Sequence, residues 1–64
     1  MYRMMYKTEG CGAAFTENVH DKDEYLRHRA LLADHIGFTT ELVNGKLFVY
    51  DKGKEYGVYY VDGE

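Results

Sequence analysis

The chain has 64 residues, of which 45% are hydrophobic and 30% are charged, and it contains no proline or tryptophan. This composition is typical of one small globular domain spanning residues 1–64, and it excludes a disordered or membrane-spanning chain. The formal net charge of −3 at pH 7 lacks the basic excess that proteins binding duplex nucleic acid usually carry. A domain this small also buries too little surface to enclose a cofactor of dinucleotide size.

The cysteine content bears on the compartment. Cys11 is the single cysteine, so no intramolecular disulfide can form. Small secreted domains usually depend on such bonds. No stretch approaches the roughly 20 apolar residues of a membrane span. We therefore expect a cytoplasmic protein that contacts no membrane.

The N-terminal segment alternates in the manner of a β-strand. Tyr2, Met4 and Tyr6 share one side of it, and the residues between them share the other. Residues 10–12 read Gly-Cys-Gly, which is typical of a turn. The next residues, 13–16, form either a short return strand or a loop, and the pattern leaves both open.

A helix of about 15 residues is predicted between Asp21 and Gly37. Asp21 followed three residues later by Glu24 is a capping pattern. Gly37 suits the left-handed residue that ends a helix, with Phe38 as its apolar contact. Within the helix the apolar residues fall on one broad face, namely Tyr25, Leu26, Ala30, Leu32, Ala33 and Ile36.

Two tight turns organise the C-terminal half. Asn44-Gly45 is the preferred two-residue hairpin turn, and it pairs residues 39–43 with residues 46–50. Lys52-Gly53 predicts a second turn into a strand over residues 55–61. The alternation then favours a register with Leu47 opposite Val58, Val49 opposite Tyr56 and Phe48 over Gly57.

These elements predict a two-layer α+β fold of order β-α-β-β-β. One helix packs on a small sheet that contains a three-stranded antiparallel meander. Residues 13–16 add a short strand before the helix if they are not a loop.

One helix covers only one face of a sheet, so the second face of the meander is the candidate functional surface. An apolar, tyrosine-rich patch left in water usually marks a contact surface. We expect it to bind another protein through five residues: Val43, Lys46, Phe48, Tyr50 and Tyr59. The alternative is that residues 10–19 fold back over this face and cover it.

Two further contacts are expected. Asp21, Asp23, Glu24 and Asp34 form a second, acidic surface. Such carboxylates can occupy positions where an enzyme of nucleic acids would bind phosphate. A homodimer through the sheet face or a sheet edge would also stabilise so thin a core.

The alternative function is single-stranded RNA or DNA binding. Lys46, Lys52 and Lys54 lie at the hairpin ends with aromatic residues between them. Stacking aromatics and cations that follow the backbone are the usual means of holding single strands.

The sequence predicts no catalytic, cofactor or metal site. Cys11 near His20 resembles a thiol–imidazole pair only in composition, and no phosphate-binding glycine loop is present. Asp21, Glu24, His28 and His35 share a stripe of the predicted helix, but their spacing matches no metal motif, and a solvated helix face explains them.

The chain resembles two groups of small proteins. The stretch Leu31–Phe38 followed by a hairpin superficially resembles small toxin ribonucleases. Their glycine-serine-histidine signature is replaced here by Asn44-Gly45-Lys46, so membership is not assigned. In size, acidity and compactness the chain resembles phage-encoded inhibitors of host nucleic-acid enzymes, including anti-CRISPR proteins. This second likeness implies a small, non-enzymatic steric or competitive inhibitor or adaptor.

Overall fold

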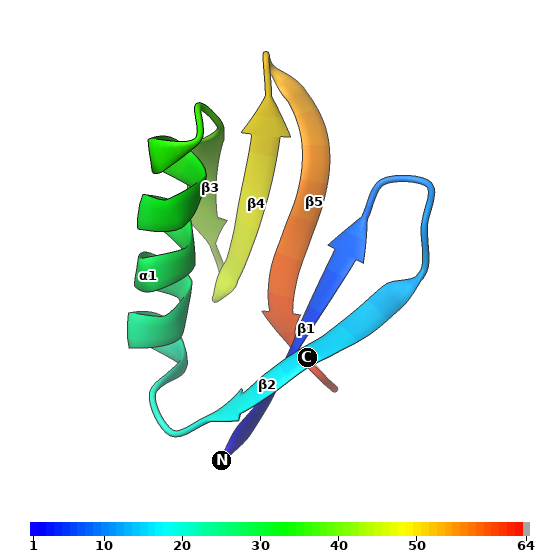
Figure 1. Ribbon diagram of the computed structural model, residues 1–64. Helices are drawn as coiled ribbons and strands as arrows, with labels where there is room; N and C mark the ends of the chain where they lie inside the picture. Colours follow the sequence, from blue (N-terminus) through cyan, green and yellow to red (C-terminus); the bar gives the residue numbers. More distant parts are fainter. Residues whose placement is uncertain (64) are drawn as a thin grey trace.

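Within residues 1–63, one antiparallel sheet of five strands carries a single helix on one face (Figure 1). The computed structural model describes residues 1–63. The elements are β1 Tyr2–Thr8, β2 Ala13–Val19, α1 Lys22–His35, β3 Thr39–Val43, β4 Lys46–Asp51 and β5 Lys54–Val61. In the sheet the strands lie in the order β2-β1-β5-β4-β3, so β2 and β3 are the edges.

The expected sheet with a three-stranded meander and a β-α-β-β-β order is wrong, although the α+β class is correct. Residues 13–19 form a full strand that pairs with β1, and β1 in turn pairs with β5. The alternation of β2 is hidden in the sequence for two reasons. A bulge at Thr16 interrupts it, and as an edge strand β2 leaves most of its side chains in water.

The predicted helix boundaries are confirmed. The Asp21 carboxylate accepts a hydrogen bond from the Glu24 N–H at 3.0 Å, which satisfies a free donor at the helix start. Gly37 has a φ of 96°, and Phe38 N–H donates to Ala33 C=O at 2.9 Å. This is the hydrogen-bond pattern of a helix closed by a left-handed glycine.

Both predicted hairpin turns are also confirmed. Asn44 and Gly45 have φ of 52° and 76°, as a type I′ turn requires, and Val43 pairs with Lys46. The Lys52-Gly53 turn has the same left-handed geometry, and it joins β4 to β5.

Beyond the second turn the predicted register is wrong by one residue. Tyr50 pairs with Glu55, but Val49 pairs with Gly57, so Tyr56 is an extra residue in β5. This β-bulge keeps Glu55 away from the core, as the prediction required. It also reverses the sides of the following residues, so that Leu47 lies opposite Tyr59 instead of Val58.

Gly57 is covered by an aromatic ring, but the ring is not that of Phe48. Phe48 pairs with Val58 on the far side of the sheet. Tyr6 of β1 lies over Gly57 on the helix side, so close that a Cβ on Gly57 would stand 2.6 Å from Tyr6 Cζ. Only glycine leaves room for this ring.

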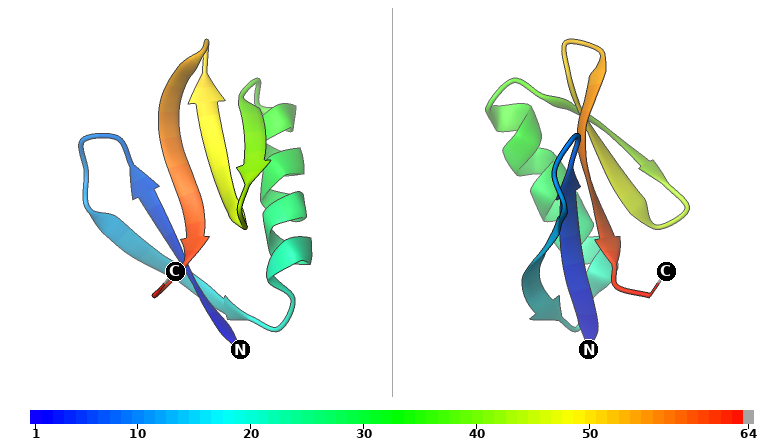
Figure 2. Two further views of the ribbon diagram at one scale, coloured as in Figure 1. Left: turned by 180° about the vertical axis from the view of Figure 1, so that it is seen from behind. Right: turned by 90° about the vertical axis from the view of Figure 1, so that its right-hand side faces the viewer.

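The core lies where α1 crosses the helix side of the sheet. Met4 and Leu26 are fully buried, and Tyr25, Leu47 and Val61 pack with them. The views of Figures 1 and 2 place α1 alongside β3 and β4, and its contacts with these strands agree. Because α1 is not centred on the sheet, the apolar Leu32 and Ile36 stay exposed instead of joining the core.

No helix within residues 1–63 is both long enough and apolar enough to cross a membrane.

Candidate protein-binding surface

The face of the sheet opposite α1 has no covering layer among residues 1–63. The pairing places Phe15, Met5 and Tyr60 in one row across β2, β1 and β5. Lys7, Val58 and Phe48 form the neighbouring row across β1, β5 and β4. We call this surface the open sheet face, and its members are Met5, Lys7, Phe15, Val43, Lys46, Phe48, Tyr50, Val58 and Tyr60.

The expected alternative, in which residues 10–19 fold back over this face, is wrong because Ala13–Val19 is itself a strand of the sheet. Ala13–Val19 is an edge strand that lies beside β1, as Figures 1 and 2 show from three sides. The segment widens the open sheet face and adds Phe15 to it. A strand in the plane of the sheet cannot also cover the sheet.

Four of the five predicted contact residues lie on the open sheet face: Val43, Lys46, Phe48 and Tyr50. The expected position of Tyr59 on this face is wrong. Tyr59 packs against the core on the helix side, because the bulge at Tyr56 reverses its orientation. Its neighbour Tyr60 occupies the open face instead.

The residues that the sequence interpretation missed come from outside the predicted meander and from beyond the bulge. Met5 and Phe15 belong to strands whose places in the sheet were not predicted. Val58 and Tyr60 lie after the bulge. The alternation of residues 2–7 did place Met5 and Lys7 on a common side, which was the one available signal.

The centre of the open sheet face is a shallow hollow between two lysines. Phe48, Val58 and Tyr60 line it together with Lys7 and Lys46, and its volume is about 280 Å³. An apolar floor with a polar rim is the usual anatomy of a protein contact.

Charges of both signs lie elsewhere on this side of the sheet. Arg3 forms an ion pair with Asp62 at 3.2 Å and stacks over the Phe15 ring at 4.2 Å. Tyr50 lies near Glu41 and Glu55, and burial together with these two carboxylates raises the pKa of Tyr50. The face is therefore mixed in charge rather than basic.

The predicted acidic surface is not one patch. Asp21 caps the start of α1, with Asp23 and Glu24 in its first turn. Asp34 lies close to the other end, about 20 Å away by the rise of a helix. All four residues are exposed. Only the three at the helix start can act together.

The three lysines predicted to bind single-stranded nucleic acid do not lie together either. Lys52 and Lys54 lie at the exposed tip of the β4–β5 hairpin, whereas Lys46 lies at the other end of β4. Lys7, which was not among the candidates, is the lysine that lies across the hollow from Lys46.

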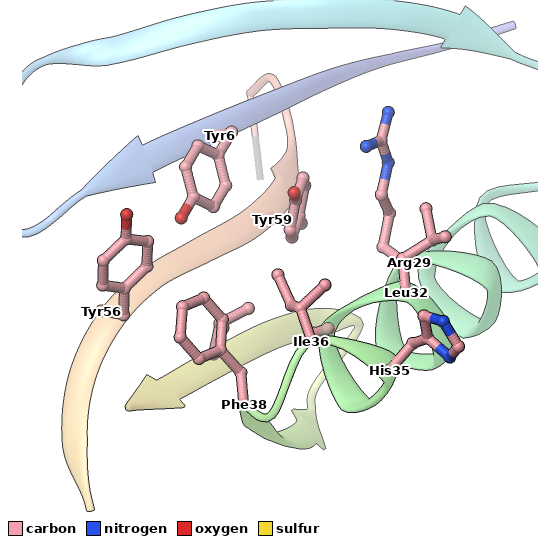
Figure 3. A pocket seen from close by; sticks show the side chains of 10 residues that line it. Tyr6, Arg29, Leu32, His35, Ile36, Phe38, Tyr56 and Tyr59 are labelled. Carbon is pink, nitrogen blue, oxygen red and sulfur yellow. The ribbon is translucent and has the colours of Figure 1, made fainter. Parts of the chain in front are cut away.

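A second apolar surface is the groove between α1 and the centre of the sheet (Figure 3). Tyr6, Tyr56 and Tyr59 approach it from the strands, with Phe38 between them and the end of the helix. Leu32 and Ile36 form the helix wall. The volume is about 400 Å³, which is enough to receive an apolar side chain.

Arg29 closes one end of this groove. Its Nη2 lies 3.5 Å from Glu17 Oε1, and its guanidinium stacks near Tyr25 and Tyr59. Burial raises the pKa of Tyr59, and Arg29 opposes part of that rise. The Arg29 side chain lines the groove and is partly exposed, and its Nε is buried with no hydrogen-bond partner among residues 1–63.

Among residues 1–63, no three His, Cys, Asp or Glu side chains come together as metal ligands would. Cys11 is exposed in the β1–β2 connection.

Comparisons with models of protein families, with curated proteins and with solved structures find no match for this chain.

Proposed function

We propose that this chain is a non-enzymatic protein-binding domain that acts as a steric or competitive inhibitor, or as an adaptor, of another protein. The observation that supports it is the open sheet face, where Phe48, Val58 and Tyr60 of β4 and β5 line a hollow between Lys7 and Lys46. Soluble proteins seldom leave such a surface in water unless it forms contacts.

The occupant proposed for this face is a protein surface with an apolar anchor. Phe48 and Tyr60 supply the aromatic area that dominates binding energy at protein interfaces. The mixed charges at the rim suit partners that are not uniformly charged. A bound partner would have the corresponding part of its own surface blocked, which is the simplest form of inhibition. A nucleic-acid enzyme of a host as the target stays a prediction.

Single-stranded nucleic acid is the second candidate occupant. One observation favours it, namely the position of Lys7 and Lys46 on either side of the Phe48 and Tyr60 rings. Glu41, Glu55 and Asp62 on the same side of the sheet oppose it, since they repel phosphate. We therefore rank it below a protein partner.

Capture from native lysate, with and without nuclease, tests the proposal. The bait is the tagged full chain beside two variants, Phe48→Asp on the open sheet face and Leu32→Asp on the helix side. We expect a stoichiometric protein that survives nuclease, binds the Leu32→Asp variant and is lost with Phe48→Asp. Since both substituted side chains are at least partly exposed, circular dichroism should show both variants folded.

Other patterns would count against this function. Nucleic acid in the eluate, with its retention lost in a Lys7→Ala, Lys46→Ala double variant and at high salt, would favour the second candidate. A partner that ignores Phe48→Asp but is lost with Leu32→Asp would move the site to the groove.

A further inference from the structure

The two edges of the sheet differ in their capacity to accept another strand. β2 bulges at Thr16 and carries Glu17 beside the bulge, and such features discourage edge pairing. β3 pairs regularly with β4 over Thr39–Val43 and contains neither proline nor lysine, and its one charged residue, Glu41, lies opposite Phe48 on the open sheet face, not on the helix side as Glu17 does. An edge strand of this kind is a template for pairing with another chain.

The free backbone groups of β3 belong to Thr40 and Leu42. Val43 and Lys46 flank a two-residue turn, so they form a hydrogen-bonded pair whose N–H and C=O groups face each other. Because this orientation alternates along a strand, Glu41 also faces β4. Thr40 and Leu42 therefore direct their N–H and C=O groups outward from the sheet.

Exposed apolar side chains accompany this edge on the helix side. Leu42 of β3 is 58% exposed, and Leu31 of α1 is 66% exposed. Two hollows lie between α1 and β3, one beside Leu31 and Thr40 and the other beside Leu42. Exposed leucines beside hollows at an unpaired sheet edge indicate a surface whose burial against a partner would be stabilising.

We propose that β3 pairs with β3 of a second copy of this chain, in an antiparallel two-fold dimer centred on Thr40. Thr40 would then exchange two hydrogen bonds with the partner's Thr40. The N–H of Leu42 in each copy would add one more to the carbonyl of Phe38. Leu42 lies opposite the partner's Phe38 in this register, so an exposed leucine gains an aromatic neighbour.

The position of the helix makes this pairing sterically consistent. α1 contacts both β3 and β4, and its Leu26 packs with core residues of β1 and β5, so the helix lies on the inner side of the β3 edge. The outer side of β3 is therefore open to a second strand, and the two-fold axis makes the two helices antiparallel on the same side of the joined sheets.

The charges on α1 select Thr40 as the centre. Arg27, Leu31 and Asp34 follow one side of the helix, and all three line the hollow shared with Thr40. Ala30 and Leu31 mark the level of Thr40, with Arg27 and Asp34 each about 5 Å from that level on opposite sides. The two-fold axis therefore brings Arg27 of each copy level with the partner's Asp34.

The two neighbouring registers lack this match. A centre at Glu41 would set two carboxylates directly opposite each other, in a pair whose Cα atoms are only about 4.5 Å apart. A centre at Leu42 would instead bring Arg27 of one copy nearly level with Arg27 of the other copy, so that two like charges would face each other. Neither Arg27 nor Asp34 has an ion-pair partner within residues 1–63, so both are available to a second copy.

This dimer does not rest on the proposed function, because it uses the β3 edge and the outer side of α1. The open sheet faces of the two copies would lie side by side on the same side of the joined sheets. A failure of the dimer would leave the open sheet face of one copy intact as a binding surface.

Sedimentation equilibrium of the full chain tests the dimer, with Cys11→Ser included to prevent disulfide-linked pairs. We expect a reversible dimer whose dissociation constant rises about tenfold or more in Arg27→Asp and in Asp34→Arg, since each change repeats twice per interface. The double variant Arg27→Asp, Asp34→Arg restores opposite charges and should return to within about threefold of the parent. A monomer at all concentrations would overturn the proposal, and so would a dimer that only Phe48→Asp disrupts.

Cysteine cross-linking tests the register. In the Cys11→Ser background, Thr40→Cys places two cysteines about 5.5 Å apart between Cα atoms, within the range of a disulfide. Glu41→Cys is the matched control. In the dimer centred on Thr40 the two copies of residue 41 are offset along the strands, so their Cα atoms are about 8 Å apart, which is beyond the range of a disulfide. Mild oxidation should link the first variant and not the second. Linking of the Glu41→Cys variant alone would overturn the Thr40 centre.

Discussion

Replacing Gly57 by alanine probes the contact between β5 and the Tyr6 ring of β1. In a strand, alanine normally stabilises by about 0.5–1 kcal/mol relative to glycine, because it loses less backbone freedom on folding. Here the added Cβ would stand 2.6 Å and 2.8 Å from Cζ and Cε1 of Tyr6. The Tyr6 ring must then leave its position, where its centroid is 4.4 Å from that of Tyr59.

Whether Gly57→Ala stabilises or destabilises the protein depends on which is larger, the gain from restricting the unfolded backbone or the cost of displacing the Tyr6 ring. Forcing extra volume into a packed site costs about 1–3 kcal/mol, so we expect Gly57→Ala to lower the free energy of unfolding by about 1–2 kcal/mol. Urea unfolding followed by circular dichroism measures this value. In a domain of this size the same loss lowers the melting temperature by about 4–8 °C per kcal/mol.

Tyr6→Ala supplies the matched control, since it removes the ring that the new Cβ would meet. In that background Gly57→Ala should become neutral or stabilising, so the double-mutant cycle should yield a coupling energy of about 1–3 kcal/mol. Gly57→Ala that stabilises the otherwise unchanged protein would refute the reasoning. So would a coupling energy near zero, because Tyr6 would then not occupy the space above Gly57.

Two further predictions concern the helix and the tyrosines. Leu26→Ala should destabilise the fold by about 2–5 kcal/mol because this side chain is fully buried. Leu32→Ala on the same helix is 46% exposed and should cost less than about 1 kcal/mol in the same urea experiment, and equal losses would show that α1 is centred differently. Burial raises the pKa of Tyr6 and Tyr59 above the ordinary tyrosine value of 10.0. Below pH 10 both the folded and the unfolded states keep these protons and the stability is complete, whereas above it the unfolded state ionises first and stability falls as pH rises through the folded pKa. Absorbance titration of tyrosinate should resolve a late-ionising class that shrinks in Tyr59→Phe, and a single transition at the ordinary pKa would contradict the burial of these rings.

The open sheet face shows how far sequence reasoning could reach toward the site. Val43, Lys46, Phe48 and Tyr50 follow from the Asn44-Gly45 turn, because a two-residue turn sets the register of both its strands. Tyr59 was misplaced because its orientation depends on the bulge at Tyr56. Phe15 was missed because an edge strand with few buried residues shows almost no alternation.

What the sequence determined by itself is local in the chain. Asp21 and Gly37 mark the ends of the helix, and Asn44-Gly45 and Lys52-Gly53 form the hairpins, because each of these features depends on hydrogen bonds and φ values within a few residues. The tertiary structure alone decided that β1 pairs with β5 and that β5 bulges. The β1–β5 pairing joins opposite ends of the chain, and the bulge at Tyr56 brings Gly57 under the Tyr6 ring of β1, so no pattern of neighbouring residues records the energy of these contacts.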